Sequence, residues 1–203
     1  MEDPIGRLLD HWFGPEPRTD EEAEALFSRW FDGGEAVDRD VRARFGDAAR
    51  AAAAGELDHW ADSARGRLAL ILLLDQVPRH LQRGSAAAFE QDGKAAALSS
   101  SGIDRRMDRE LPALERAFFY LPLQHAESLP AQERSVQAYE ALAAEHPDPP
   151  VGPMLGRFLE YARVHRDIVE RFGRFPHRNR HLNRSDTDEE RLFLRNGGPT
   201  FGQ

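Results

Sequence analysis

The stretch Leu68-Ala69-Leu70-Ile71-Leu72-Leu73-Leu74 decides the fold of this chain, because it is the only long apolar run in the sequence. A membrane-spanning helix needs roughly 20 apolar residues, so this run is too short to cross a bilayer. A helix that is apolar on nearly all sides is typical of one surrounded by other helices. We therefore predict a central core helix near Ser63 to Gln82.

Outward from this run, apolar residues recur at three- and four-residue steps, and the alternation expected of strands is missing. The pattern predicts an all-α protein of about nine helices, separated by glycine and proline turns. The predicted helices lie near Pro4 to Phe13, Thr19 to Phe31, Glu35 to Ala54, Ser63 to Gln82, Ser85 to Ser99, Asp108 to Tyr120, Ser128 to Glu145, Pro153 to Phe172 and Thr187 to Arg195.

Short loops between consecutive helices predict antiparallel helical hairpins, packed as an irregular bundle or as a stack of hairpins. The length of 203 residues and the hydrophobic content of 40% suit one domain with a substantial core. We place this domain at residues 1–196 and expect a loose tail over residues 197–203.

Composition excludes several classes of function. The formal net charge of −8 disfavours nucleic acid and acidic membranes as partners, because both require a positive face. With no cysteine, there is no disulfide, thiolate nucleophile or cysteine-ligated metal. We expect no metal and no cofactor. The acidic start Met1-Glu2-Asp3 differs from a secretory signal, so a cytoplasmic location is expected.

The segment Phe172–Arg184 reverses the sign of the charge locally, because it holds four arginines, two histidines and no acid. Gly173 ends the preceding helix and Pro176 stiffens the chain that follows. Arg174, His177, Arg178 and Asn179 should therefore project from a short, stiff turn. The planar fork of arginine fits carboxylate or phosphate oxygens. Carboxylates of the same chain would satisfy these arginines equally well, so a structural salt-bridge network remains an alternative.

A second polar group follows the apolar run. Asp75, Arg79 and Arg83 are spaced by four residues, so they project from one helix face. Pro78 lies among them, where it leaves the carbonyl of Leu74 without its usual donor and bends the helix. A kink beside charges at the end of a core helix favours a polar pocket. The alternative is an exposed ion pair that contributes about 0.3–0.5 kcal/mol.

The stretch Leu121–Glu127 is predicted to be a non-helical junction between two helices. His125 could act there as an acid or base, with Glu127 orienting a ring or sharing a proton. His-x-Glu also opens the zinc-deaminase signature, but the cysteines which that signature requires are missing. The alternative is a capping histidine followed by a helix-entry acid.

His165 lies on the apolar face of the helix before the basic segment, so it should point inward. A lone histidine on such a face is more often a hydrogen-bonded core residue than a ligand-binding group. Both interpretations remain open for His165.

Three strings of residues resemble a known family: Leu72-Leu73-Leu74-Asp75-Gln76-Val77-Pro78-Arg79 with Arg83-Gly84, Leu121-Pro122 with His125 and Glu127, and Phe172-Gly173-Arg174-Phe175-Pro176-His177-Arg178-Asn179. With them, the chain resembles the bacterial domain-of-unknown-function family numbered 924 over nearly its whole length. The resemblance implies an all-helical fold similar to tetratricopeptide-like superhelices, and no established activity. Ala126 departs from the family's pattern, in which serine is common, so a serine nucleophile is missing beside His125.

Two hypotheses of different classes follow. In the first, the three polar groups converge on a pocket that binds a small anionic molecule, with hydrolysis by water as the first chemistry to consider. Its catalytic candidates are His125, Glu127, His177 and Asp75, and its ligand-binding candidates are Arg79, Arg83, His165, Arg174, Arg178 and Asn179. In the second, a helical scaffold binds a protein segment, and the polar groups are internal latches. The sequence has no P-loop, Gly-x-Gly-x-x-Gly, Gly-x-Ser-x-Gly or His-Glu-x-x-His motif.

Overall fold

Helices build the whole framework of the protein. The computed structural model describes residues 3–201, and no strand occurs among them. The α-helical segments are α1 (Pro4–Phe13), α2 (Asp20–Phe31), α3 (Gly34–Ala53), α4 (Ala64–Ile71), α5 (Val77–Leu81), α6 (Asp92–Asp104), α7 (Ala113–His125), α8 (Leu129–Glu145), α9 (Val151–Phe172) and α10 (Asp188–Arg195). Because α4 and α5 are two halves of one interrupted helix, the described residues confirm the predicted all-α class and its nine helices.

The apolar run at the centre of the sequence is also the centre of the core. Residues Leu68 to Leu74 are fully buried, and α4 packs against α1, α6 and α7. None of the helices in the described part of the chain is long and apolar enough to cross a membrane. The run therefore supplies the buried centre that its composition predicts.

A π-helical turn over Leu72–Gln76 joins α4 to α5. The N–H of Val77 donates to the carbonyl of Leu72, five residues earlier. Pro78 supplies the physical reason, because its nitrogen has no hydrogen and cannot donate to the carbonyl of Leu74. Single π-turns of this kind re-aim side chains and are frequent at functional sites. The predicted distortion before Pro78 is confirmed, and it falls on Asp75 and Gln76.

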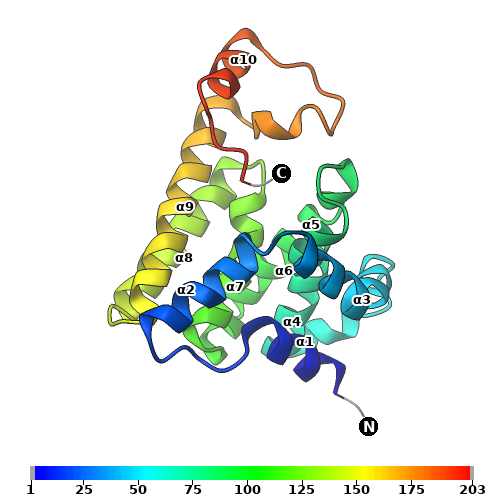
Figure 1. The fold of residues 1–203 in the computed structure, drawn as a ribbon, viewed down its shortest axis with the longest axis vertical. Coiled ribbons are helices and arrows are strands. Elements are labelled where there is room, and N and C mark those ends of the chain that lie inside the picture. Colours follow the sequence, from blue (N-terminus) through cyan, green and yellow to red (C-terminus); the bar gives the residue numbers. More distant parts are fainter. Residues whose placement is uncertain (1–2, 202–203) are drawn as a thin grey trace.

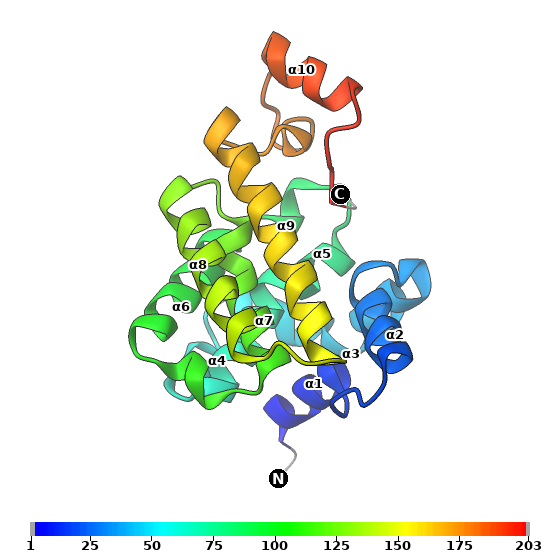
Figure 2. The ribbon, with the colours of Figure 1, turned by 90° about the vertical axis from the view of Figure 1, so that its left-hand side faces the viewer.

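Helices α7, α8 and α9 form consecutive hairpins, with α8 packed against both of its neighbours. The two views show α8 and α9 lying side by side (Figures 1 and 2). The predicted non-helical junction at Leu121–Glu127 is wrong, because α7 continues through Pro122 to His125. Burial of α7 from Ala113 to Gln124 outweighs the hydrogen bond that Pro122 lacks.

Two other helix boundaries differ from the predictions. The helix predicted from Ser85 begins only at Asp92, after a short 3₁₀ turn at Ala86–Ala88. The helix predicted from Asp108 begins at Ala113, after a second 3₁₀ turn at Met107–Glu110. The superhelical stacking implied by the family resemblance remains a prediction.

The basic segment and α10 lie beyond the ends of the other helices, where α9 leads up to them (Figure 1). Gly173 ends α9 in the left-handed region, with φ of 69°. A small second core forms there around Ile168, Val169 and Phe175. Within the predicted tail over 197–203, the ring of Phe201 stacks on His165 at 3.7 Å between centroids. Residues 202–203 lie outside the described residues, and the loose tail remains a prediction.

Candidate functional site

A cavity of about 280 Å³ opens where α2, α5, α7, α9 and the basic segment meet. Six of the predicted site residues line it: Arg79, Arg83, His125, His165, His177 and Arg178. They come from positions spread over about half of the chain. The structure therefore brings together the main members of all three polar groups around one cavity.

Asp75 and His125 form a hydrogen-bonded pair at the wall of the cavity. The Nδ1 atom of His125 lies 2.7 Å from Oδ1 of Asp75. The π-turn places Asp75 behind the cavity wall, where it is fully buried, and the last turn of α7 places His125 in front of it. The amide of Gln76 donates to the other carboxylate oxygen at 2.6 Å. Both oxygens of Asp75 are thus held in place.

The charges around this pair fix the protonation of the imidazole. Burial alone would raise the pKa of the Asp75 carboxyl, but Arg79 and then His125 hold that pKa below its usual range. Burial and then the charge of Arg79 lower the pKa of His125, and Asp75 opposes this only partly. An ionised carboxylate accepts hydrogen bonds only, so a neutral His125 donates from Nδ1. Its Nε2 then carries a lone pair, as a general base requires.

One carboxylate bridges two arginines of the site. Arg79 donates to Asp92 through both terminal nitrogens, at 2.9 and 3.0 Å. Arg178 donates to the same carboxylate at 3.0 Å. The Arg178 guanidinium also lies over the rings of Phe89 and Phe175, at 4.5 and 4.7 Å from their centroids. Burial lowers the pKa of Arg178 to about 10, which still leaves it cationic at neutral pH.

Two further histidines of the wall are neutral. His165 donates from Nδ1 to the carbonyl of Tyr161 at 2.7 Å, and burial holds the pKa of its imidazole well below the usual value. Its ring lies 6.1 Å from that of His125. Burial and then Arg178 lower the pKa of His177 to about 3. The Nδ1 atom of His177 is buried and makes no hydrogen bond within the described protein.

A separate charged group joins the end of α5 and the residues just after it to α3. Arg83 donates to both oxygens of Asp38 at 3.1 and 3.0 Å. His80, which also lines the cavity, lies with Nδ1 2.7 Å from the same carboxylate. Arg83 therefore combines a structural ion pair with a place on the cavity wall.

Four of the ten predicted site residues do not line the cavity, so the polar residues do not all converge on it. Asp75 lies behind the wall, and the other three make contacts elsewhere. Glu127 accepts from the backbone N–H of Phe175 at 2.8 Å and from Arg184 at 2.6 Å. Arg174 binds Glu190 at 2.6 and 2.8 Å. Asn179 donates to Asp186 at 2.7 Å. These contacts link the basic segment to Glu127, Asp186 and α10, and the role of internal latches remains a hypothesis.

Other residues of the site were not predicted. Asp92 bridges the two arginines, and Gln76 and Gln124 add amide groups. Aromatic side chains from α2 and α9 also line the cavity: Phe27, Trp30, Phe31, Phe158 and Tyr161. Asp92 could have been predicted, because buried arginines require a carboxylate partner. The aromatic residues carried no such signal, because their helical spacing equally suits a core.

No group of three or more histidine, aspartate or glutamate side chains with the geometry of a metal site occurs in residues 3–201. The polar arrangement is instead one of hydrogen-bond donors. Guanidinium groups and neutral imidazoles line the cavity. The carboxylates of Asp75, Asp92 and Asp38 are not among the residues that line it. Such a wall can bind an anion and place a base next to it.

The fold and the site together describe an all-helical protein with a cavity lined by arginine, histidine and aromatic side chains. The chain belongs to the family described as bacterial protein of unknown function (DUF924), whose family model matches residues 8–198. The solved structure of a protein of unknown function from Agrobacterium tumefaciens is 43% identical, with a TM-score of 0.75 over 86% of this chain and 92% of that one. No match was found among curated proteins.

Proposed function

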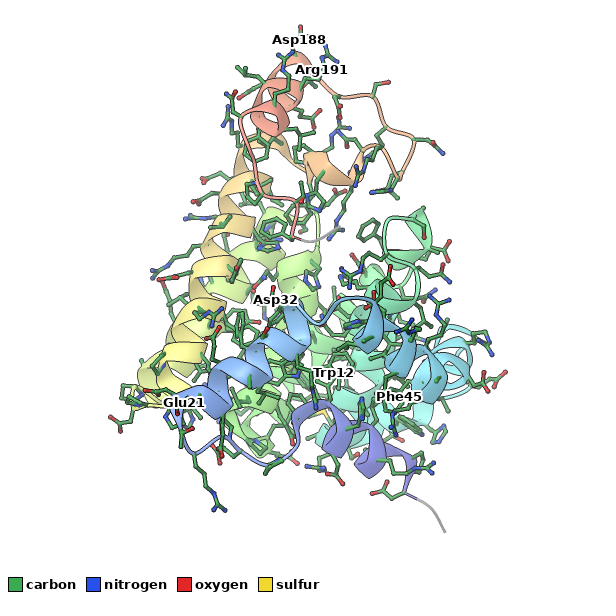
Figure 3. The ribbon with its side chains drawn as sticks, viewed as in Figure 1. Trp12, Glu21, Asp32, Phe45, Asp188 and Arg191 are labelled. Atoms are coloured by element: carbon green, nitrogen blue, oxygen red, sulfur yellow. The ribbon has the colours of Figure 1, made fainter. Side chains whose placement is uncertain are left out.

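We propose that the cavity binds a small anionic molecule through Arg79 and Arg178. The observation that carries this proposal is the arrangement of charge. Three guanidinium groups line the cavity, and Asp32 is the one carboxylate among its lining residues in the described chain. Asp32 closes α2 near the centre of the view in Figure 3. Buried cations facing a concave space favour a carboxylate or phosphate as the occupant.

The Asp75–His125 pair adds a chemical capability to this site. Asp75 orients the imidazole through Nδ1, and the free Nε2 can take a proton from a water molecule. No serine, threonine or lysine is among the described residues that line the cavity, and the chain has no cysteine. We take water as the nucleophile of the proposed reaction, which is hydrolysis of an ester, amide or phosphate ester bond within a bound molecule that keeps a separate anionic group.

The scaffold hypothesis is the second candidate, and a specific observation favours it. Phe31 and Tyr161 line the cavity and are also 41% and 46% exposed. Exposed aromatic side chains at a concave mouth suit contact with a protein segment. We favour the small anion because His125, His165, Arg79 and Arg178 surround one space, whereas a scaffold predicts only separated latches.

Thermal unfolding against a panel of carboxylate and phosphate metabolites at fixed ionic strength tests the proposal. A ligand at one hundred times its dissociation constant should add about 2.7 kcal/mol, which raises the midpoint by roughly 5–10 °C. Arg178→Gln should abolish the shift. The matched control is Arg174→Gln, which changes an arginine of the same segment that binds Glu190 outside the cavity and should preserve the shift. A panel that moves no midpoint contradicts the proposal.

The catalytic part has its own test. His125→Gln removes the proposed base but retains a polar side chain of similar reach. It should preserve the thermal shift and slow hydrolysis of an ester bond in a substrate that keeps its anionic group by about 10²–10⁴-fold. Hydrolysis at the wild-type rate in this variant would exclude His125 as the base.

A further inference from the structure

Half of the cavity wall is built to exclude water rather than to bind charge. Phe31 lies 4.7 Å from Phe27 and 5.8 Å from Phe158 between ring centroids. Trp30 and Tyr161 extend this surface along α2 and α9. We call these five lining residues (Phe27, Trp30, Phe31, Phe158 and Tyr161) the aromatic wall, and they line the same cavity as Arg79 and Arg178.

A purely ionic ligand would leave this aromatic wall in contact with water. Inorganic phosphate or acetate carries no apolar surface that could cover the rings. Phe31 and Tyr161 remain substantially exposed at the mouth, and covering apolar surface is favourable in proportion to the area removed from water. The aromatic wall therefore favours a ligand with an apolar group, which the arginines alone do not require.

We propose that the ligand is an amphipathic organic anion, in which a carboxylate or phosphate group is attached to an aromatic ring or a comparable apolar group. This inference rests on the proposed function. The charged group lies at Arg79 and Arg178, and the apolar group packs between α2 and α9. A volume of about 280 Å³ is close to the lower end of the range for ligand pockets. The ligand is therefore small, on the order of one ring with its charged group.

The neutral histidines also suit a cavity with a charged region at the arginines and an apolar region beside it. Burial keeps the imidazoles of His125 and His165 below their usual pKa, so they add no positive charge at neutral pH. His165 also has one face covered by Phe201, at 3.7 Å between ring centroids. The positive charge is thus confined to the arginine end, which leaves a region suited to an apolar group beside it.

The experiment measures dissociation constants for matched pairs by isothermal titration calorimetry at fixed ionic strength. The pairs are acetate with phenylacetate and methyl phosphate with phenyl phosphate, and phenylacetamide is the uncharged control. We expect the phenyl member of at least one pair to bind tenfold or more tightly than its methyl partner. Phenylacetamide should bind at least tenfold more weakly than phenylacetate. The two pairs also distinguish a carboxylate from a phosphate headgroup.

Failure of this inference and failure of the proposed function give different results. If methyl and phenyl members bind equally well, the anion site stands and the amphipathic ligand is excluded. If no charged member of either pair binds, the proposed anion function itself fails. If phenylacetamide binds as tightly as phenylacetate, the cavity binds the phenyl group without regard to charge, and both proposals are overturned.

Two variants locate the apolar group. Phe31→Ala and Tyr161→Ala remove partly exposed side chains, which favours retention of the fold. Each should reduce the phenyl-to-methyl affinity ratio by fivefold or more, while the affinity for the methyl anion stays the same. Leu192→Ala is the control, because Leu192 is 50% exposed on α10 and does not line the cavity. A ratio unchanged in both aromatic variants would contradict the proposed position.

Discussion

Asp92 shows how much one buried carboxylate contributes to this site. It accepts hydrogen bonds from Arg79 and Arg178, whose side chains are 12% and 7% exposed. Removing one member of a buried ion pair leaves the remaining charge without compensation in a low-dielectric environment. Asp92 therefore determines whether two arginines can be held at the cavity wall.

The variant Asp92→Asn should destabilise the protein by about 3–5 kcal/mol. The control is Asp188→Asn, since Asp188 also pairs with an arginine, Arg191, but has a side chain that is 97% exposed. Asp188 and Arg191 lie on α10 at the outer end of the molecule (Figure 3). Asp188→Asn should lower the free energy of unfolding by less than about 1 kcal/mol. Equal midpoints of urea unfolding for the two variants would show that the Asp92 pairs are not structurally important.

The lowered pKa of His177 predicts that the free energy of unfolding depends on pH. Its pKa is lowered to about 3 in the folded protein by burial and then by Arg178, against about 6.5 in an unfolded chain. The unfolded state therefore binds more protons between these values. The stabilising contribution is fully present above about pH 6.5 and is lost as the pH falls toward about 3.

Urea unfolding at pH 7.5 and pH 5 measures this effect. The wild type should lose about 2 kcal/mol more over this interval than His177→Gln, because the variant lacks the group that the unfolded chain protonates. The other buried histidines are present in both proteins and contribute equally. Parallel losses in the two proteins would contradict the assignment.

At the residue scale, the sequence indicated several residues that line the cavity but not the carboxylate that pairs with its arginines. Arg79, Arg178, His125 and His165 were identified because each stands in a locally unusual setting: a proline kink, a reversed charge, or an apolar helix face. Asp92 was missed because its ion pair with Arg178 joins positions 86 residues apart. Local spacing carries no information about such pairs.

At the scale of elements, the packing of α6 on α7 requires a glycine. A Cβ atom at Gly102 would lie 2.5 Å from Cζ of Phe119 and 2.8 Å from Cδ of Arg67. Phe119 is fully buried, so its ring has no space into which it can move. Close approach of the two helices, rather than turn geometry, explains this glycine.

Gly102→Ala should destabilise the protein by about 1–3 kcal/mol through this overlap. Gly93→Ala on the same helix is the control, because a Cβ atom there meets nothing within 4 Å. The control should be neutral or stabilising by up to about 1 kcal/mol, since alanine favours the helix. Thermal or urea unfolding compares the two variants, and a neutral Gly102→Ala would contradict the close packing of α6 on α7.

Most element types followed from periodicity, because buried faces recur every three or four residues. The exceptions lie where packing overrides local signals. Pro122 predicted a junction, but α7 is buried along most of its length and stays helical through it. In contrast, Pro78 produced the expected distortion, because it follows a core helix whose end can widen into a π-turn. The sequence alone could not distinguish these two prolines.

At the scale of the whole molecule, the cavity contrasts with the rest of the protein. The chain has a net charge of −8, yet three arginines and one aspartate line the cavity. The wall is assembled from α2, α5, α7, α9 and the basic segment. The ion pair of Glu127 with Arg184 links the basic segment to the loop after α7. The fold therefore places three arginines on the wall of one cavity, with the carboxylates that pair with them, Asp92 and Asp38, outside the lining. This placement is the basis on which we propose the anion site.

Imidazole resonances of the protein in NMR spectra test this account most directly. Of the eight histidines, His80, His125, His165 and His177 line the cavity, and His59 and His146 lie elsewhere. The spectrum is recorded with and without phenylacetate and phenyl phosphate at concentrations that saturate the calorimetric signal. The account predicts shifts of the His125, His165 and His177 resonances and unchanged His59 and His146 resonances. Saturable binding that leaves the cavity histidines unchanged, or an absence of binding by either anion, would contradict it.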